Sequence, residues 1–218
     1  MTNIYQSLEA ARQAYQPTPE PPAGYRLVGA FSGWHGEQWG FVAFNESTQA
    51  ALIAFRGTDP THLPEWIADG AALLVPIPWD PQHEGGWFHY GFLGIYNASR
   101  NAITALLRPL NATSLCIVGH SLGGPLATLC AFENRQMNPT VVTFASPRPG
   151  SHKFADTFDR LVPNCTRVKN LGDIVTEIPG MLFFSHVGKV MEIRGGQDWR
   201  NPAIAHGLDS GYKLGLLP

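Results

Sequence analysis

The sequence contains little cysteine and little charge. Three cysteines among 218 residues form no disulfide framework and no metal-ligand spacing, so neither a disulfide scaffold nor a bound metal is expected. Charged residues make up 15% of the chain with a formal net charge of −2, which argues against the basic surface of a nucleic-acid-binding protein. No stretch approaches the roughly 18 apolar residues of a membrane span, so no transmembrane segment is expected. Residues 1–7 lack the basic and apolar regions of a signal peptide, which favours the cytoplasm, or secretion if the chain is a mature form.

Short apolar runs alternate with segments of helical periodicity along most of the chain. Residues 3–16 carry apolar side chains at helical spacing, and prolines between positions 17 and 22 end that helix. The remaining pattern predicts strands at 25–31, 40–44, 50–55, 115–118, 140–144, 165–169 and 188–193, helices at 89–107, 124–132 and 150–161, and a loop at 75–88. This alternation predicts one α/β domain, residues 1–218, with a mainly parallel central sheet flanked by helices on both faces.

The stretch Gly119-His120-Ser121-Leu122-Gly123 follows an apolar strand and precedes a helix. In this context G-x-S-x-G is the pattern of a nucleophile elbow, whose serine stands on a strained turn, exposed at the carboxyl end of the sheet. Close packing around such a turn leaves no room for side chains at Gly119 and Gly123. The alternative is a glycine-rich turn whose serine only caps the helix. Because the flanking strand and helix are both present, we interpret Ser121 as a nucleophile.

A serine nucleophile needs a general base, and the base needs an acid that holds its tautomer. In this type of fold the acid follows the serine in the sequence and the base follows the acid. Asp173 comes after the strand 165–169, on a loop at its carboxyl end, and is the best acid; the alternative is a turn-forming residue. Asp156 and Asp159 lie within the helix 150–161, where we expect solvated side chains.

Two histidines near the end of the chain are candidates for the base. His206 lies on a loop beyond the last strand, and His186 stands at the start of that strand. We favour His206, because a base on a loop can reach the serine, whereas a strand side chain faces core or solvent. His120 is held inside the turn beside Ser121 and is expected to be a packing residue, and His152 is expected on a helix surface.

Acyl transfer also needs donors for the oxyanion that forms at the attacked carbonyl. The N–H of Leu122, at the start of the helix after Ser121, is one candidate. Thr58 follows the early strand 50–55 and can offer both its N–H and its hydroxyl, while Gly57 lets the backbone approach. The alternative for this pair is an ordinary Gly-Thr turn.

Several motifs in order along the chain resemble the class 3 lipase family, which comprises the fungal triacylglycerol lipases and their relatives. These motifs are Phe55-Arg56-Gly57-Thr58, Trp66-Ile67-Ala68-Asp69, His89-x-Gly91-Phe92, Gly119-His120-Ser121-Leu122-Gly123-Gly124 and Thr143-Phe144-Ala145-Ser146-Pro147-Arg148-x-Gly150. Asp173-Ile174-Val175 with Pro179, and His206 ahead of Tyr212, complete a pattern over roughly residues 40–212. Ala145 stands where a glycine is usual in the family.

The resemblance implies an α/β-hydrolase fold and hydrolysis of carboxylic esters without a cofactor. Carried over to this chain, it makes Ser121 the nucleophile, Asp173 the acid and His206 the base, with Thr58 and Leu122 as the oxyanion hole. The expected substrate is a lipid or another acyl ester, including esters at a lipid–water interface. The alternatives are a phospholipase or short-chain esterase on the same scaffold, and a catalytically idle module that binds a partner or lipid.

Family members carry a helical lid after the oxyanion residue, and the corresponding segment here is 59–70. Pro60, Pro64 and Gly70 leave room for at most two short helical turns in it. So small a cover buries few apolar side chains, and part of that gain is lost in ordering its backbone. We therefore expect marginal closure and weak activation at a lipid interface.

Overall fold

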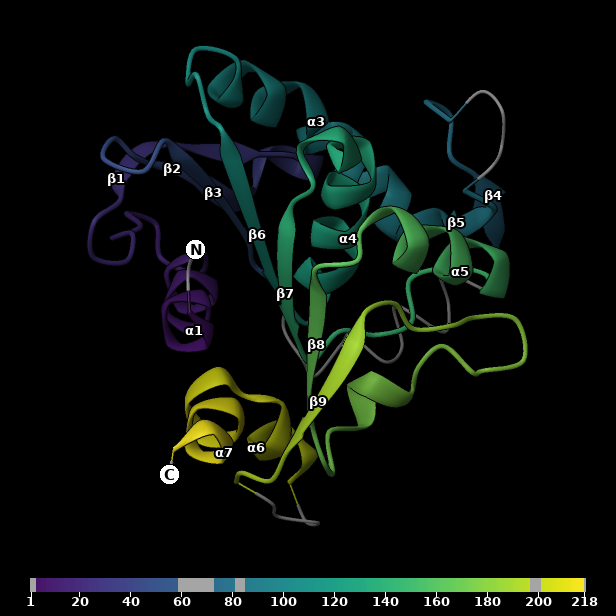
Figure 1. Cartoon of the computed structure of the whole chain (residues 1–218). Helices are drawn as coiled ribbons and strands as arrows, with labels where there is room; N and C mark the ends of the chain where they lie inside the picture. Colours follow the sequence, from purple (N-terminus) through teal and green to yellow (C-terminus); the bar gives the residue numbers. More distant parts are fainter. Residues whose placement is uncertain (1–2, 59–72, 81–84, 197–200, 218) are drawn as a thin grey trace.

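The fold is seen in a computed structural model that describes residues 3–58, 73–80, 85–196 and 201–217. The expected lid at 59–70, and with it the motif Trp66-Ile67-Ala68-Asp69, lie outside these residues. Figure 1 shows a central sheet with helices on either side of it and both chain termini on the same side of the sheet.

The central sheet has seven strands in the order β1-β2-β3-β6-β7-β8-β9. They are β1 (Arg26–Ser32), β2 (Gln38–Asn45), β3 (Ala50–Phe55), β6 (Ser114–His120), β7 (Thr140–Phe144), β8 (Cys165–Asn170) and β9 (Lys189–Ile193). The first three pair antiparallel, and every pairing from β3 to β9 is parallel. The expected α/β fold with a mainly parallel sheet is confirmed. The parallel strands place their carboxyl ends along one edge, where the loops after β3, β6 and β8 meet.

The described residues form α-helices, 3₁₀-helices and a π-helix. They are α1 (Ile4–Gln13), α3 (Tyr90–Leu107), α4 (Gly123–Glu133), α5 (His152–Leu161), α6 (Pro202–His206), α7 (Leu214–Leu216), the 3₁₀-helices η1 (Trp34–Gly36), η2 (Arg135–Met137) and η3 (Ile174–Glu177), and the π-helix η4 (Leu208–Lys213). Asn3 caps α1 through a reciprocal pair of hydrogen bonds with Gln6, and the Ser151 side chain accepts from the Phe154 N–H at the start of α5. Within the described ranges, no helix combines the length and the apolar character needed to cross a bilayer.

Two apolar cores lie on the two faces of the sheet, because successive strand residues point to opposite faces. Ile53 and Ile117 belong to the core beneath α3, α4 and α5. Leu52 and Val118 belong to the other core, beneath α1 and the C-terminal helices. Figure 1 shows α1, α6 and α7 on one side of the sheet and α3 and α4 on the other, as expected from the sequence.

Two details differ from the expectation. The segment 75–88 is not wholly a loop, because β4 (Leu74–Pro76) and β5 (Trp87–His89) pair antiparallel at its ends. His206 ends the short helix α6 instead of lying on a loop. All three segments are short, and the local preference of so few residues is weak.

Candidate active site

Ser121 lies at the apex of a strand-turn-helix unit between β6 and α4. Its φ of 56° falls in the left-handed region, which is unusual for a residue with a side chain. Two backbone hydrogen bonds hold it there: the Ser121 N–H donates to Phe144 O at 2.9 Å, and the Gly124 N–H donates to Ser121 O at 2.9 Å. The parallel neighbour β7 thus fixes the turn from one side and the first turn of α4 fixes it from the other.

The glycines around Ser121 lie where a side chain would collide with backbone. A Cβ at Gly123 would come within 2.6 Å of the carbonyl oxygens of Phe55 and Arg56, at the end of β3. A Cβ at Gly119 would overlap the backbone of Gly123. The expectation that both positions need glycine is confirmed, and the same packing brings the end of β3 against the elbow.

Ser121, His206 and Asp173 are joined in a row by hydrogen bonds. His206 Nε2 lies 2.9 Å from Ser121 Oγ, and His206 Nδ1 lies 3.0 and 3.1 Å from the two carboxylate oxygens of Asp173. Because an ionised carboxylate only accepts, the ring hydrogen belongs on Nδ1, and Nε2 is then free to accept the Ser121 hydroxyl proton. The three residues predicted from the sequence therefore form the geometry of a Ser-His-Asp triad.

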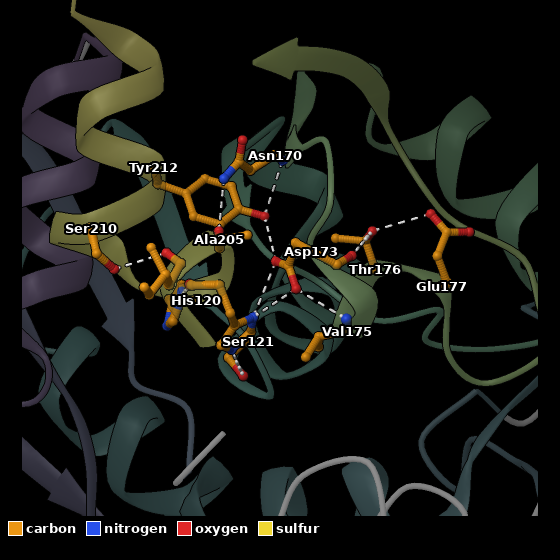
Figure 2. A network of polar contacts seen from close by, with 12 residues as sticks. His120, Ser121, Asn170, Asp173, Val175, Thr176, Glu177, Ala205, Ser210 and Tyr212 are labelled. Atoms are coloured by element: carbon orange, nitrogen blue, oxygen red, sulfur yellow. Dashed lines mark hydrogen bonds and ion pairs between the residues drawn. The ribbon is translucent and has the colours of Figure 1, made fainter. Parts of the chain in front are cut away.

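Asp173 is held by more than the histidine, as Figure 2 shows. Its Oδ1 accepts the Val175 N–H at 3.0 Å, and its Oδ2 accepts the Tyr212 hydroxyl at 2.8 Å. Burial, and secondarily the charge of Asp173, raise the pKa of Tyr212, so the phenol keeps the proton that it donates. The phenolic oxygen also accepts the Asn170 N–H at 3.2 Å. Asp173 thus has a fixed orientation toward His206.

Asn170 links this acid to the segment that carries the base. Its side-chain nitrogen donates to Gly195 O at 2.6 Å and to Ala205 O at 2.8 Å, next to His206. Its side-chain oxygen accepts the Gly195 N–H at 2.9 Å. Sequence reasoning named Tyr212 only as part of a motif and missed Asn170, because their partners lie 25 to 42 residues away in the chain.

All three members of the row are buried, with exposed fractions of 0% for Ser121, 2% for Asp173 and 3% for His206. The expectation that Ser121 stands exposed above the sheet is therefore wrong. Part of the reason is the close approach of the residues after β3, because a Cβ at Gly57 would lie 2.7 Å from Ser121 Cβ. The hydroxyl faces His206 in an enclosed site.

The other acid and base candidates lie elsewhere. Asp156 and Asp159 are exposed on α5, and so is His152, as expected. His186 hydrogen-bonds through Nε2 to Thr176 O at 2.8 Å. Its burial, followed by the charges of Arg167 and Arg148, lowers the pKa of His186 to about 3. His120 is buried as expected, but both of its ring nitrogens are hydrogen-bonded, so it does more than fill space.

Leu122 directly follows Ser121 in the chain, and Thr58 directly follows Gly57, which packs against Ser121. Leu122 is buried as the N-cap residue of α4. Thr58 is half-buried and follows Gly57, where an added Cβ would lie 2.7 Å from Ser121 Cβ. These positions suit donors to an oxyanion at Ser121. Their role as an oxyanion hole stays a prediction.

Metal-binding side chains are not grouped within the described ranges, where no set of three or more His, Cys, Asp or Glu could hold an ion. All three cysteines are buried and unpaired with one another. Burial raises the pKa of both Cys130 and Cys165 to about 12, so these thiols stay protonated.

Comparisons with known proteins place this geometry in context. A family model described as "Lipase (class 3)" matches residues 52–183, more than half of the 218 residues. The chain is 31% identical over 236 aligned residues to "Phospholipase A1-II 3" of Oryza sativa subsp. indica, covering 87% of this chain and 54% of that protein. It is 31% identical over 160 residues to a lipase of Rhizomucor miehei, covering 68% of this chain and 43% of that one.

A solved structure shares the fold over most of its length. It is the structure described as "A serine protease triad forms the catalytic centre of a triacylglycerol lipase". The TM-score is 0.71 at 26% identity, covering 88% of this chain and 79% of that chain. The chain spans about half the length of the curated relatives that it matches.

Proposed function

The chain belongs to the class 3 lipase family, and we propose that it is a serine carboxylic ester hydrolase that acts on lipid or other acyl esters. The observation that carries this proposal is the unbroken row Ser121–His206–Asp173, with 2.9 Å between Ser121 Oγ and His206 Nε2. An idle binding module would be free to lose any of the three side chains or their mutual contacts. The presence of all three in hydrogen-bonding contact supports the hydrolase instead.

In the proposed mechanism His206 Nε2 takes the hydroxyl proton of Ser121 while Ser121 Oγ attacks the ester carbonyl. Asp173 stabilises the imidazolium that forms. His206 then passes the proton to the departing alcohol, which leaves an acyl group on Ser121. Water, activated by His206 in the same way, attacks the acyl-enzyme and releases the carboxylic acid. Protons and the acyl group pass only between these side chains, the substrate and water.

Acylation and deacylation each pass through a tetrahedral intermediate with an oxyanion. We assign the hydrogen-bond donors to that oxyanion as the N–H of Leu122 and Thr58. Leu122 follows Ser121 at the start of α4, and Thr58 follows Gly57, which packs against Ser121. Donors held by the backbone before reaction begins stabilise the developing charge without reorganisation.

The proposed substrates are esters presented at a lipid surface. Met181, Leu182 and Phe183 are three consecutive apolar residues with exposed fractions of 72%, 77% and 59%. They lie in the connection between β8 and β9, which also carries Asp173. Phospholipids are a second candidate class beside triacylglycerols, because the rice relative is named a phospholipase A1. Hydrolysis of phosphatidylcholine compared with triolein, both as emulsions, distinguishes the two.

The test of the proposal is reaction with a fluorophosphonate, which labels a serine only where a base activates it. We expect stoichiometric labelling of Ser121 in the wild type. We expect Ser121→Ala and His206→Ala to lose labelling and to lower kcat on a soluble ester by roughly 10⁴-fold or more. His186→Ala is the matched control and should keep its activity, because His186 contacts Thr176 instead of Ser121.

Three outcomes would contradict the proposal or one of its residue assignments. A wild-type protein that neither hydrolyses esters nor reacts with the probe would support the idle module. A folded Ser121→Ala variant with near wild-type turnover would exclude Ser121 as the nucleophile. If His186→Ala, and not His206→Ala, removed activity, the base would have to be reassigned.

A further inference from the structure

Tyr15, just beyond the end of α1, connects the N-terminal segment to two parts of the candidate site. Its hydroxyl oxygen lies 2.7 Å from His120 Nδ1 and 2.9 Å from the Gly57 nitrogen. On the far side of the same imidazole, His120 Nε2 lies 3.0 Å from the backbone carbonyl oxygen of His206. One chain of hydrogen bonds therefore runs from the backbone before Thr58, through Tyr15 and His120, to the backbone of the base.

The direction of donation along this chain follows from its two ends. The His206 carbonyl can only accept, so His120 Nε2 carries the ring hydrogen. Burial, followed by the neighbouring His206, lowers the pKa of His120 to about 3, so the ring is neutral and its Nδ1 accepts. The Tyr15 hydroxyl must then donate to Nδ1, which leaves its oxygen to accept the Gly57 N–H. The direction of donation is therefore fixed for each hydrogen bond from Gly57 to His206.

Close packing makes this chain stiff. A Cβ at Gly57 would lie 2.7 Å from Ser121 Cβ, 2.8 Å from the Tyr15 hydroxyl and 3.0 Å from the His120 carbonyl oxygen. The Tyr15 ring meets the edge of the His120 ring with centroids 5.8 Å apart, and the His120 ring lies 4.9 Å from that of His206. A small displacement of Tyr15 therefore moves the residues after β3 and the base together.

We propose that Tyr15 is a positioning residue of the hydrolase site, which holds the Gly57 peptide beneath Thr58 and, through His120, the backbone of His206. The inference rests on the proposed function and adds to it a part for the N-terminal segment. Tyr15 touches no reacting atom. It sets where the oxyanion donor and the base stand relative to Ser121, so its hydroxyl acts on the transition state more than on substrate binding.

The test compares two variants that each lose one tyrosine hydroxyl, one just beyond the end of α1 and one within α1. Tyr15→Phe should lower kcat on a soluble ester about 10-fold with KM unchanged, the change in rate that the loss of one hydrogen bond produces. Tyr5→Phe is the matched control, because the Tyr5 hydroxyl also ties α1 to a distant backbone carbonyl, Leu216 O at 2.7 Å. It should keep the wild-type kcat, and thermal melts verify that both variants fold.

A double-mutant cycle tests the chain itself. His120→Gln keeps a donor near Nε2 but removes the Nδ1 acceptor, so it breaks the same link as Tyr15→Phe. Because Tyr15→Phe also removes the acceptor of the Gly57 N–H, we expect the double variant to lose about as much kcat as Tyr15→Phe alone, and less than the two single losses multiplied together. Additive losses would show that Tyr15 does not act through His120 and would overturn the proposal.

The remaining outcomes separate this proposal from the proposed function. If the wild type reacts with the fluorophosphonate and Tyr15→Phe keeps its kcat, the role of Tyr15 is disproved and the hydrolase stands. If Tyr5→Phe loses as much kcat as Tyr15→Phe, attachment of α1 is the cause, and the positioning role is again disproved. If the wild type itself is inert to both probe and ester, the proposed function fails first and the role of Tyr15 fails with it.

Discussion

His120 and His186 are held neutral by their surroundings, although an imidazole in water titrates near pH 6.5. Burial is the main cause in each case and lowers both pKa values to about 3. His120 is further affected by His206, and His186 by Arg167 and Arg148. Each uses its Nε2 to bind a backbone carbonyl, which needs only the neutral ring. These residues act as fixed neutral donors and not as proton carriers.

We predict that these histidines reduce stability in acid. Below about pH 6.5 the unfolded chain protonates both imidazoles, whereas the folded chain does so only near pH 3. Between these values the unfolded state binds more protons, so the free energy of unfolding falls as the pH falls. His186→Asn should make this fall shallower, as measured by urea unfolding from pH 7 to pH 4. His152→Asn, on the exposed face of α5, controls for the loss of one histidine, and equal slopes in wild type and His186→Asn would refute the assignment.

At the scale of single elements, the elbow between β6 and α4 depends on contacts with the end of β3. Gly123 lies where a Cβ would reach 2.6 Å from two carbonyl oxygens, those of Phe55 and Arg56. The chain continues from these residues to Gly57 and Thr58. The elbow and the proposed oxyanion loop therefore share one close contact that a single methyl group would disturb.

We predict that Gly123→Ala lowers the free energy of unfolding by about 1–3 kcal/mol, the usual cost of overpacking. It should also lower kcat sharply, because the end of β3 must move away from Ser121. Gly94→Ala is the control: Gly94 lies within α3 with nothing within 4 Å of its added Cβ. That change should raise stability by up to about 1 kcal/mol through helix propensity. Urea denaturation measures both, and an unchanged stability in Gly123→Ala would disprove the predicted crowding.

On the scale of the whole molecule, the connection from β8 to β9 carries both a residue of the candidate active site and a group of exposed apolar side chains. It carries Asp173 near its start and continues to the exposed Met181, Leu182 and Phe183. Its further course is fastened to the loop before α5, since Ser185 N–H donates to Gly150 O at 2.8 Å. A lipid surface that receives these side chains would lie against the same connection that orients the base.

We predict that serine at positions 181, 182 and 183 together (Met181→Ser, Leu182→Ser and Phe183→Ser) lowers the rate on an emulsified long-chain ester by about 10-fold or more. Each fully buried apolar side chain contributes roughly 1.5–3 kcal/mol to adsorption. The rate on a dissolved short-chain ester should stay the same. Leu27→Ser, an exposed apolar residue in β1 at the opposite edge of the sheet, is the control and should leave both rates unchanged. An equal loss on both substrates would place the effect in the site instead of in adsorption.

Local patterns in the sequence were sufficient for the strands of the central sheet, for the elbow and for the order of the triad, but not for β4 and β5. A short apolar run such as the one ending at Gly119 is typical of a buried strand, and the spacing of Gly119, Ser121 and Gly123 is typical of the elbow. Asp173 was recognisable because it directly follows a strand at its carboxyl end. These features depend on residues within a few positions of one another, which the sequence displays directly.

Three features depend on the tertiary structure. They are the choice of His206 over His186 as the partner of Ser121, the burial of Ser121, and the contact between Tyr15 and His120. Both histidines lie near the last strand, and only packing places one at 2.9 Å from Ser121 and the other at Thr176. Tyr15 and His120 are 105 positions apart in the sequence. They meet because α1 packs against β6 on one face of the sheet, and β6 ends at His120. Contacts of this kind arise from the burial of whole faces, which no local pattern encodes.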